Sequence, residues 1–233
     1  MGLSFIYSNS QTIDMDLQTN EKGIISQEEM FDIIASCDFI WSDNSIRQKA
    51  LFSILYLTGA RIAELCTSYQ RVGHYNPLNQ KVESWEYVQS RNGILKSDVK
   101  IIGNDVYITL PIRKKRKKIS DRRDIKNEHT LVISKKSPYM TFFLDYLETI
   151  ENDDDPIFDF TTRTAGSWIK MIDNYLNKKG FYCHLFRKTR LTHISKISET
   201  EEDIRQWAGH SDTRSLKPYI ALRPIKKFKD VIE

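Results

Sequence analysis

Three short segments of the sequence carry side chains that could act together on a phosphate ester. Arg61 lies in the segment TGARIAEL. His184 and Arg187 begin and end the segment HLFR, a spacing that puts both side chains on one face of a helix. The segment AGH ends at His210, and Tyr219 follows nine residues later. These residue types can bind an anionic group, transfer protons and supply a nucleophile.

Each of these residues, taken alone, has an ordinary structural explanation. An arginine near the end of a helix is most often a surface or ion-pair residue, so Arg61 alone would indicate little. His184 alone would be a typical core or surface histidine, and Tyr219 alone would be explained by packing. His210 could simply mark the end of a helix. Their joint occurrence in this order is what favours a functional site.

A fourth feature is a short basic segment, RKKRKKISDRRDIK, at residues 113–126. It holds nine basic and two acidic side chains, whereas the whole chain has a net charge of only +4, so the rest of the chain is net negative. Basic charge concentrated in this way favours contact with a polyanion, although a solvated loop or a localisation signal would look the same. The side chains expected to contact such a polyanion are Arg113, Lys115, Arg116, Lys117, Lys118, Arg122 and Arg123.

Capping residues and hydrophobic spacing predict a mostly helical chain. Ser26 and Glu29 form a capping box ahead of a helix near 26–37. Gly59 stands where a C-cap glycine is expected, after an apolar repeat that runs from about 43 to 58. Ser137 and Pro138 begin a later helix. Further helices are expected near 61–68, 163–179, 184–195, 200–207 and 213–222.

Alternating apolar residues predict one small antiparallel sheet. Its strands are expected at 99–101, at 106–110 and at 129–134, so that the basic segment links two of them. Residues 69–95 contain two glycines, one proline and several aromatics, and we expect an irregular insertion with some structure of its own. The predicted fold class is therefore mainly α with a small antiparallel β-sheet (α+β).

Composition excludes several classes of protein. Hydrophobic residues make up 40% and charged residues 28% of the 233 positions, which is not the composition of a disordered chain. No apolar run is long enough for a transmembrane helix, and no secretory signal is present, so we expect no membrane partner. The three cysteines are far apart and odd in number, which predicts no disulfide framework, no metal site and a reducing, cytoplasmic location.

The four features, in this order along the chain, resemble the tyrosine recombinases, the phage-type integrases. The resemblance covers roughly residues 23–222 and implies the catalytic-domain fold of that family, with 69–95 as an insertion. Residues 1–22 are expected to be a flexible N-terminal tail, and 223–233 a C-terminal tail. The sequence departs from the family pattern at Phe186, usually leucine, in AGH for the commoner LGH, and in Pro218 before the tyrosine. None of these differences removes a catalytic group.

The resemblance implies an activity and a role for each site residue. The activity is cleavage and rejoining of DNA strands through a 3′-phosphotyrosyl intermediate, with no metal and no other cofactor. Arg61 and Arg187 would hold the phosphate, and Tyr219 would be the nucleophile. His184 would accept a proton, and His210 would donate to the scissile phosphate.

The family also uses a lysine on a β-hairpin as general acid. Lys114 is our choice for this role, because it lies just where the strand that runs from Asp105 to Ile112 is expected to end. Lys115, Lys117 and Lys118 remain open as alternatives.

The resemblance further implies double-stranded DNA as partner and a homo-oligomer, a tetramer, on that DNA. It would place the protein at the nucleoid and is compatible with an origin in a virus, a plasmid or another mobile element. Residues 1–22 are too short to form the helical domain that usually completes the DNA clamp in this family. Two alternatives stay open: a non-catalytic DNA-binding protein of the same fold, and a DNA-relaxing enzyme that resembles type IB topoisomerases.

Overall fold

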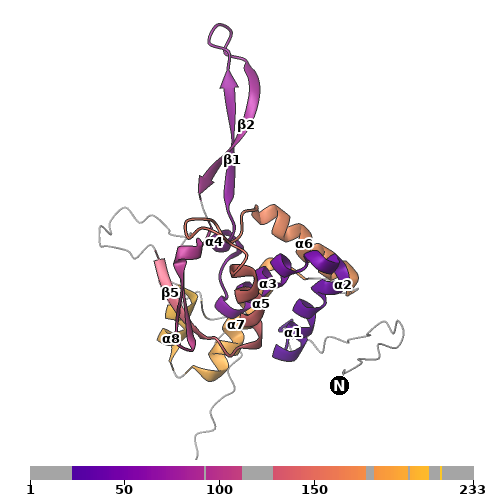
Figure 1. Cartoon of the computed structure of the whole chain (residues 1–233), viewed down its shortest axis with the longest axis vertical. Coiled ribbons are helices and arrows are strands. Elements are labelled where there is room, and N and C mark those ends of the chain that lie inside the picture. The colour runs from indigo at the N-terminus through magenta and orange to yellow at the C-terminus, as the bar shows by residue number, and fades with distance from the viewer. Residues whose placement is uncertain are drawn as a thin grey trace, which may run out of the picture.

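The protein has a helical body with a small sheet at one side and a long two-stranded ribbon that projects from it (Figure 1). The computed structural model describes residues 23–91, 93–111, 128–176, 181–198, 200–209 and 216. None of the described helices combines the length and the hydropathy that a membrane crossing requires.

Eight α-helices are found among the described residues. They are α1 (Gln27–Ala35), α2 (Cys37–Trp41), α3 (Ile46–Thr58), α4 (Ile62–Leu65), α5 (Pro138–Leu147), α6 (Thr162–Tyr175), α7 (Cys183–Ile197) and α8 (Glu201–Ala208). Short 3-10 turns lie at Ser42–Asn44 and Lys96–Asp98. The strands are β1 (Ser68–Tyr75), β2 (Val82–Arg91), β3 (Val99–Ile102), β4 (Asp105–Pro111) and β5 (Glu128–Ser134).

Helix α3 forms the centre of the body. Every residue from Ala50 to Thr58 is buried, as expected for a helix that other helices surround. It packs against α1, α5 and α7. Gly59 ends α3 in the left-handed conformation, with φ of 62°, and its N–H donates to Leu55 O. The predicted C-cap glycine is thereby confirmed, and the chain turns sharply where TGARIAEL begins.

The predicted helix starts are also confirmed. Ser26 caps α1 through a capping box with Glu29, and Ser137 precedes Pro138 at the first position of α5. The boundaries differ in places from those predicted. The helix expected at 26–37 is two helices with a break at Ser36, and the helix after Arg61 ends at Leu65. The helix predicted at 213–222 lies outside the described residues, apart from Leu216.

The predicted three-stranded antiparallel sheet is confirmed, in the order β3-β4-β5. The residues that alternate along β4 and β5 toward the body are buried, namely Val106, Ile108, Leu110, Leu131 and Ile133. Pro111 pairs with Glu128, so the two strands that flank the basic segment are hydrogen-bonded neighbours. The basic segment itself, residues 113–126, lies wholly within residues 112–127, outside the described part of the chain.

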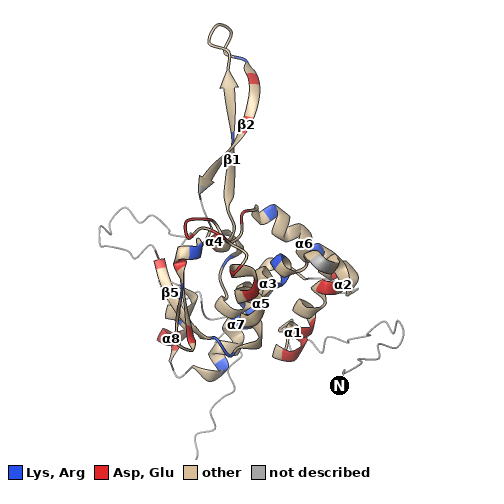
Figure 2. Ribbon diagram, in the orientation of Figure 1, with Lys and Arg blue, Asp and Glu red and all other residues tan. Residues whose placement is uncertain are grey.

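The expectation that residues 69–95 have some structure of their own is confirmed, but the predictions that this segment is irregular and that the chain has one sheet only were wrong. β1 and β2 form a second, two-stranded antiparallel sheet, with Ser68 opposite Arg91 at its base. Both strands are rich in tyrosine, tryptophan and valine, which favour strands, and Asn76-Pro77 begins the turn, so strand propensity outweighs the loop-like composition. The ribbon carries residues of both charges (Figure 2).

Gly93 provides a test of how the ribbon joins the body. A Cβ at this position would lie 1.8 Å from Leu65 O and 2.8 Å from the carbonyl carbon of Cys66, and neither backbone atom can rotate away. We expect Gly93→Ala to destabilise the fold by about 2–3 kcal/mol, seen as a lower melting temperature. Gly166→Ala is the matched control, because nothing lies within 4 Å of its Cβ in α6 and alanine favours a helix. Equal melting temperatures for the two variants would contradict the close approach.

Candidate active site

Arg61 lies at the N-terminus of α4 and is held by one carboxylate. Its backbone N–H donates to Glu64 Oε2 at 2.7 Å, and its guanidinium Nη1 donates to Glu64 Oε1 at 2.8 Å. The Glu64 side chain is only 2% exposed, whereas the Arg61 side chain is 26% exposed. The carboxylate therefore fixes the arginine from the inside and leaves part of the guanidinium at the surface.

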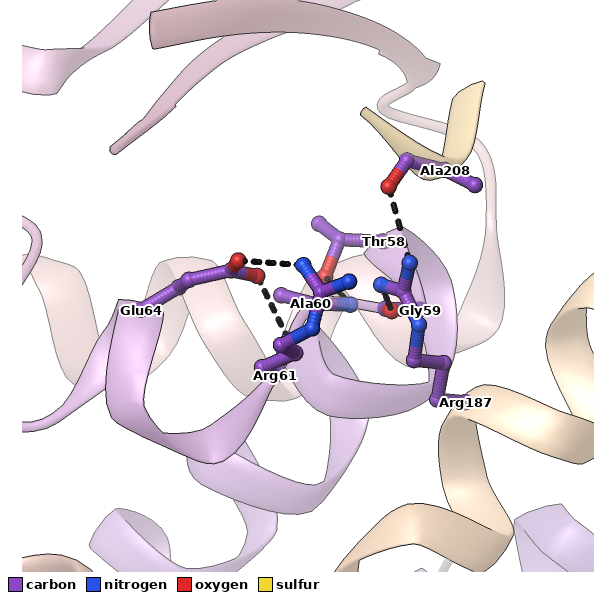
Figure 3. Close-up of polar contacts among 7 residues, drawn as sticks. All are labelled: Thr58, Gly59, Ala60, Arg61, Glu64, Arg187 and Ala208. Atoms are coloured by element: carbon purple, nitrogen blue, oxygen red, sulfur yellow. Dashed lines mark hydrogen bonds and ion pairs between the residues drawn. The ribbon is translucent and has the colours of Figure 1, made fainter. Parts of the chain in front are cut away.

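Arg187 is buried and reaches the same turn from α7. Its Nη1 donates to Gly59 O, a residue 128 positions away in the chain, and its Nη2 donates to Ala208 O at 2.8 Å. Figure 3 shows the Arg61 and Arg187 guanidiniums directed to the same side of the turn, with Gly59 and Ala60 between them. Two arginines from distant segments thus meet where α3 ends.

The last turn of α8 is fastened to the end of α3 by further contacts. Trp207 Nε1 donates to Thr58 O at 3.1 Å. The guanidinium of Arg190 lies between two rings, 5.5 Å from the centre of Tyr56 and 5.2 Å from that of Trp207. Burial lowers the pKa of Arg190 and raises that of Tyr56. The position of α8 therefore depends on side chains from α3 and α7.

The structure places three of the predicted catalytic residues. Arg61 and Arg187 converge as described, and His184 lies exposed in the first turn of α7, one turn before Arg187. Lys114, His210 and Tyr219 lie outside the described residues. So do all the predicted DNA-contacting residues, Arg113, Lys115, Arg116, Lys117, Lys118, Arg122 and Arg123. Among the described residues, no group of three histidine, cysteine or acidic side chains could hold a metal ion.

Two residues of this region were not predicted as site residues. Glu64 is one of them, and it forms an ion pair with Arg61. His129, at the start of β5, was counted only as a strand residue. Its ring lies against Gly209, where an added Cβ would come within 2.9 Å of it, and its Nδ1 is buried without a hydrogen-bond partner. Spacing along the sequence gave no signal for His129, because only the pairing of β4 with β5 brings it to α8.

The electrostatics of His129 reflect this position. Burial lowers its pKa, and the nearby guanidiniums of Arg187 and Arg61 lower it further. The negative charge of Glu64 and a hydrogen bond to the backbone of Trp207 raise the pKa of His129, but the net change is a decrease. The imidazole is thereby kept neutral at a point where a third positive charge would face two arginines.

This shift predicts a pH dependence of stability. The folded state binds a proton at His129 less readily than the unfolded state, so the free energy of unfolding should fall as the pH drops below about 6.5. His129→Gln should flatten this decrease, measured as the melting temperature across a pH series. Burial also lowers the pKa of His193, to about 4, so His129→Gln should reduce the decrease without abolishing it. An identical pH profile for native protein and His129→Gln would show that His129 does not contribute.

Comparison with known structures identifies the fold. XerA recombinase superposes with a TM-score of 0.57 at 18% identity, over 86% of this chain and 60% of that one. XerH site-specific recombinase bound to its difH substrate gives 0.56 at 14% identity, over 84% and 49%. A lambda integrase dimer bound to a COC′ core site gives 0.51 at 12% identity, over 90% and 50%.

The chain therefore spans about half to three fifths of the length of these proteins. No protein-family model matches the sequence, and no curated protein matches it. The resemblance drawn from the motifs is confirmed at the level of the fold: this chain has the fold of the tyrosine recombinase catalytic domain, mainly α with small antiparallel sheets.

Proposed function

We propose that this protein is a site-specific DNA recombinase or integrase of the tyrosine recombinase type. The observation that carries the proposal is the convergence of Arg61 and Arg187 on the turn after α3, each oriented by a buried acceptor. Phosphodiester substitution gathers negative charge on the non-bridging oxygens, and two oriented guanidiniums can stabilise that charge. The fold comparison supports the same reading.

The proposed reaction is a pair of transesterifications. The phenolic oxygen of Tyr219 attacks the phosphorus, a tyrosyl–phosphate bond forms, and the bond to the 5′ oxygen breaks. The phenol loses a proton and the leaving oxygen gains one, which gives a 3′-phosphotyrosyl link and a free 5′-hydroxyl. Attack by a 5′-hydroxyl of another strand reverses the step, and no bond energy is lost to water.

The remaining site residues have roles in moving protons and binding the phosphate. His184, exposed one turn before Arg187, is proposed to accept the proton of the nucleophile. Lys114 is proposed to protonate the leaving oxygen, and His210 to donate to the scissile phosphate. The other basic residues of 113–126 would contact the DNA backbone, which positions a duplex without reading its sequence.

The proposed partners follow from this activity. The substrate is double-stranded DNA, and recombination of two sites calls for a homo-oligomer, proposed as a tetramer. Such a protein would act in the compartment that contains the DNA, and it would suit a mobile element.

Tyr219→Phe tests the proposal. The probe is a pool of nicked duplexes with a randomised segment, in which cleavage near the nick releases a short strand and traps the covalent adduct. Native protein should form an adduct that survives denaturing electrophoresis, and Tyr219→Phe should form none while still binding DNA, because only the nucleophilic oxygen is removed. Tyr175→Phe, an exposed tyrosine on α6, is the matched control and should retain the adduct.

An adduct of undiminished yield in Tyr219→Phe would overturn the assignment. Absence of any adduct in native protein that binds the duplexes would favour a DNA-binding protein without catalysis. Joining of strands from two duplexes, recovered by sequencing, separates a recombinase from an enzyme that only relaxes DNA.

Arg61→Ala tests the electrostatic role of the arginine pair. Its charge should matter most in the transition state, so single-turnover cleavage should fall by about 10² or more, while DNA binding changes by a small factor. Because Glu64 loses its partner, the melting temperature must be measured on the same preparation. Arg47→Ala, at the opposite end of α3, is the control and should cleave normally. A lower melting temperature with intact cleavage per folded molecule would mean that Arg61 only holds the turn.

A further inference from the structure

The ribbon of β1 and β2 stands away from the body, and its contacts with the rest of the described chain lie at its base (Figure 1). There, the hydroxyl of Tyr69 donates to the carboxylate of Asp159, and Ser90 Oγ donates to Ser68 O at 3.0 Å. Beyond these contacts both faces of the ribbon are largely exposed. Strands of this length extend about 25–30 Å at 3.3 Å per residue.

One face of the ribbon is aromatic. The pairing places Tyr69, Arg71 and Gly73 of β1 on the same face as Tyr87 and Trp85 of β2. Tyr87 is 70% exposed and Trp85 48% exposed, and the guanidinium of Arg71 lies 3.9 Å from the centre of the Trp85 ring. Tyrosine, tryptophan and arginine are the residues that most often dominate the binding energy of protein interfaces.

The charge of the ribbon does not suit a polyanion. Residues 68–91 contain three basic side chains, Arg71, Lys81 and Arg91, and two acidic ones, Glu83 and Glu86, so the net charge of the ribbon is small. Glu86 also accepts from His74 at 3.0 Å. A DNA duplex attracts surfaces with an excess of lysine and arginine, so the ribbon favours a protein as its partner.

The ribbon is also an incomplete sheet. Among the described strands, β1 and β2 pair only with each other, so each has one outer edge. An isolated two-stranded sheet is marginally stable in water, and an open edge is a template for another strand. Pairing at one edge with a second ribbon would produce a four-stranded sheet.

The residues of β1 are complementary to a second copy of themselves. If two β1 strands pair antiparallel about a two-fold axis at Val72, the two Val72 side chains face each other. Gln70 then lies opposite His74, Tyr69 opposite Tyr75, and Arg71 opposite Gly73, with each pair on one face of the sheet. This register pairs valine with valine, tyrosine with tyrosine, and glutamine with histidine. No charged residue lies directly opposite another charged residue.

β2 is the poorer choice for the same contact. It carries Glu83 and Glu86, and pairing two copies about Glu86 near the middle of the strand would place two carboxylates directly opposite each other. β1 contains no carboxylate, and self-pairing about a two-fold axis gives a closed dimer rather than an open chain of subunits. We propose that this protein forms a dimer through its β1 edges, paired antiparallel about Val72. This inference does not rest on the proposed recombinase activity.

The first test uses the full chain without DNA. Native protein should dimerise in a concentration-dependent way in sedimentation equilibrium. Val72→Lys places two ammonium groups opposite each other and should weaken the association constant by about tenfold or more. Val88→Lys is the matched control, an exposed valine of β2 on the same face of the ribbon, and it should dimerise as native protein does.

The second test detects the register directly. Directly opposite residues in an antiparallel pair have Cβ atoms about 4.5–5.5 Å apart, close to disulfide reach. Val72→Cys should therefore yield a disulfide-linked dimer under mild oxidation, whereas Val88→Cys should not. Native protein should not cross-link either, and it controls for disulfides formed by the partly exposed Cys183.

Three results would overturn the proposal. Native protein that stays monomeric at all concentrations would mean that another protein or a DNA duplex covers the ribbon. An equal decrease in the association constant for Val72→Lys and Val88→Lys would exclude the β1 edge as the dimer interface. Cross-linking at position 88 but not at 72 would place the contact on β2.

Discussion

One buried guanidinium holds the site together. The helices α3 and α8 both end in glycines with positive φ, Gly59 and Gly209, and helix C-termini leave carbonyl oxygens without partners and carry partial negative charge. Arg187 donates to a carbonyl at each of these ends. The charge of the arginine is compensated, and the ends of two helices are fixed to α7 by the same group. Without it, the two carbonyl ends would face each other at the centre of the fold.

This arrangement explains why an arginine pair can be ready for an anion before it binds. A guanidinium has five donors in a rigid plane, and bonds to fixed acceptors set the orientation of the whole plane. Arg187 is oriented by backbone carbonyls and Arg61 by the buried carboxylate of Glu64. Donors oriented in advance cost no reorganisation when charge develops nearby. The neutral state of His129 fits the same requirement, because a third cation there would repel both arginines.

The sequence predicted the local features of this region and missed the long-range ones. The left-handed conformation of Gly59 and the starts of α1 and α5 depend on neighbouring residues, so capping patterns were sufficient. Arg187 donates to backbone carbonyls, and because every residue has one, the residue types at Gly59 and Ala208 do not indicate this contact. His129 reaches α8 only through the pairing of β4 with β5. The ribbon was missed because glycine, proline and exposed aromatics are common to loops and to edge strands, and propensity alone does not separate the two.

The ribbon can be added to the fold without disturbing the site because it begins and ends at the same place. Ser68 lies opposite Arg91, and within a few residues Cys66 and Leu95 are bridged to neighbouring backbone at Phe158 and Pro156. Gly93 passes so close to Leu65 that α4, which carries Glu64, is fixed from behind by the returning chain. The two arginines and the aromatic face of the ribbon therefore belong to separate parts of the molecule. A contact made along the outer edge of the ribbon has no need to change the geometry at Arg61, so the chain can present a binding surface and a phosphate site independently.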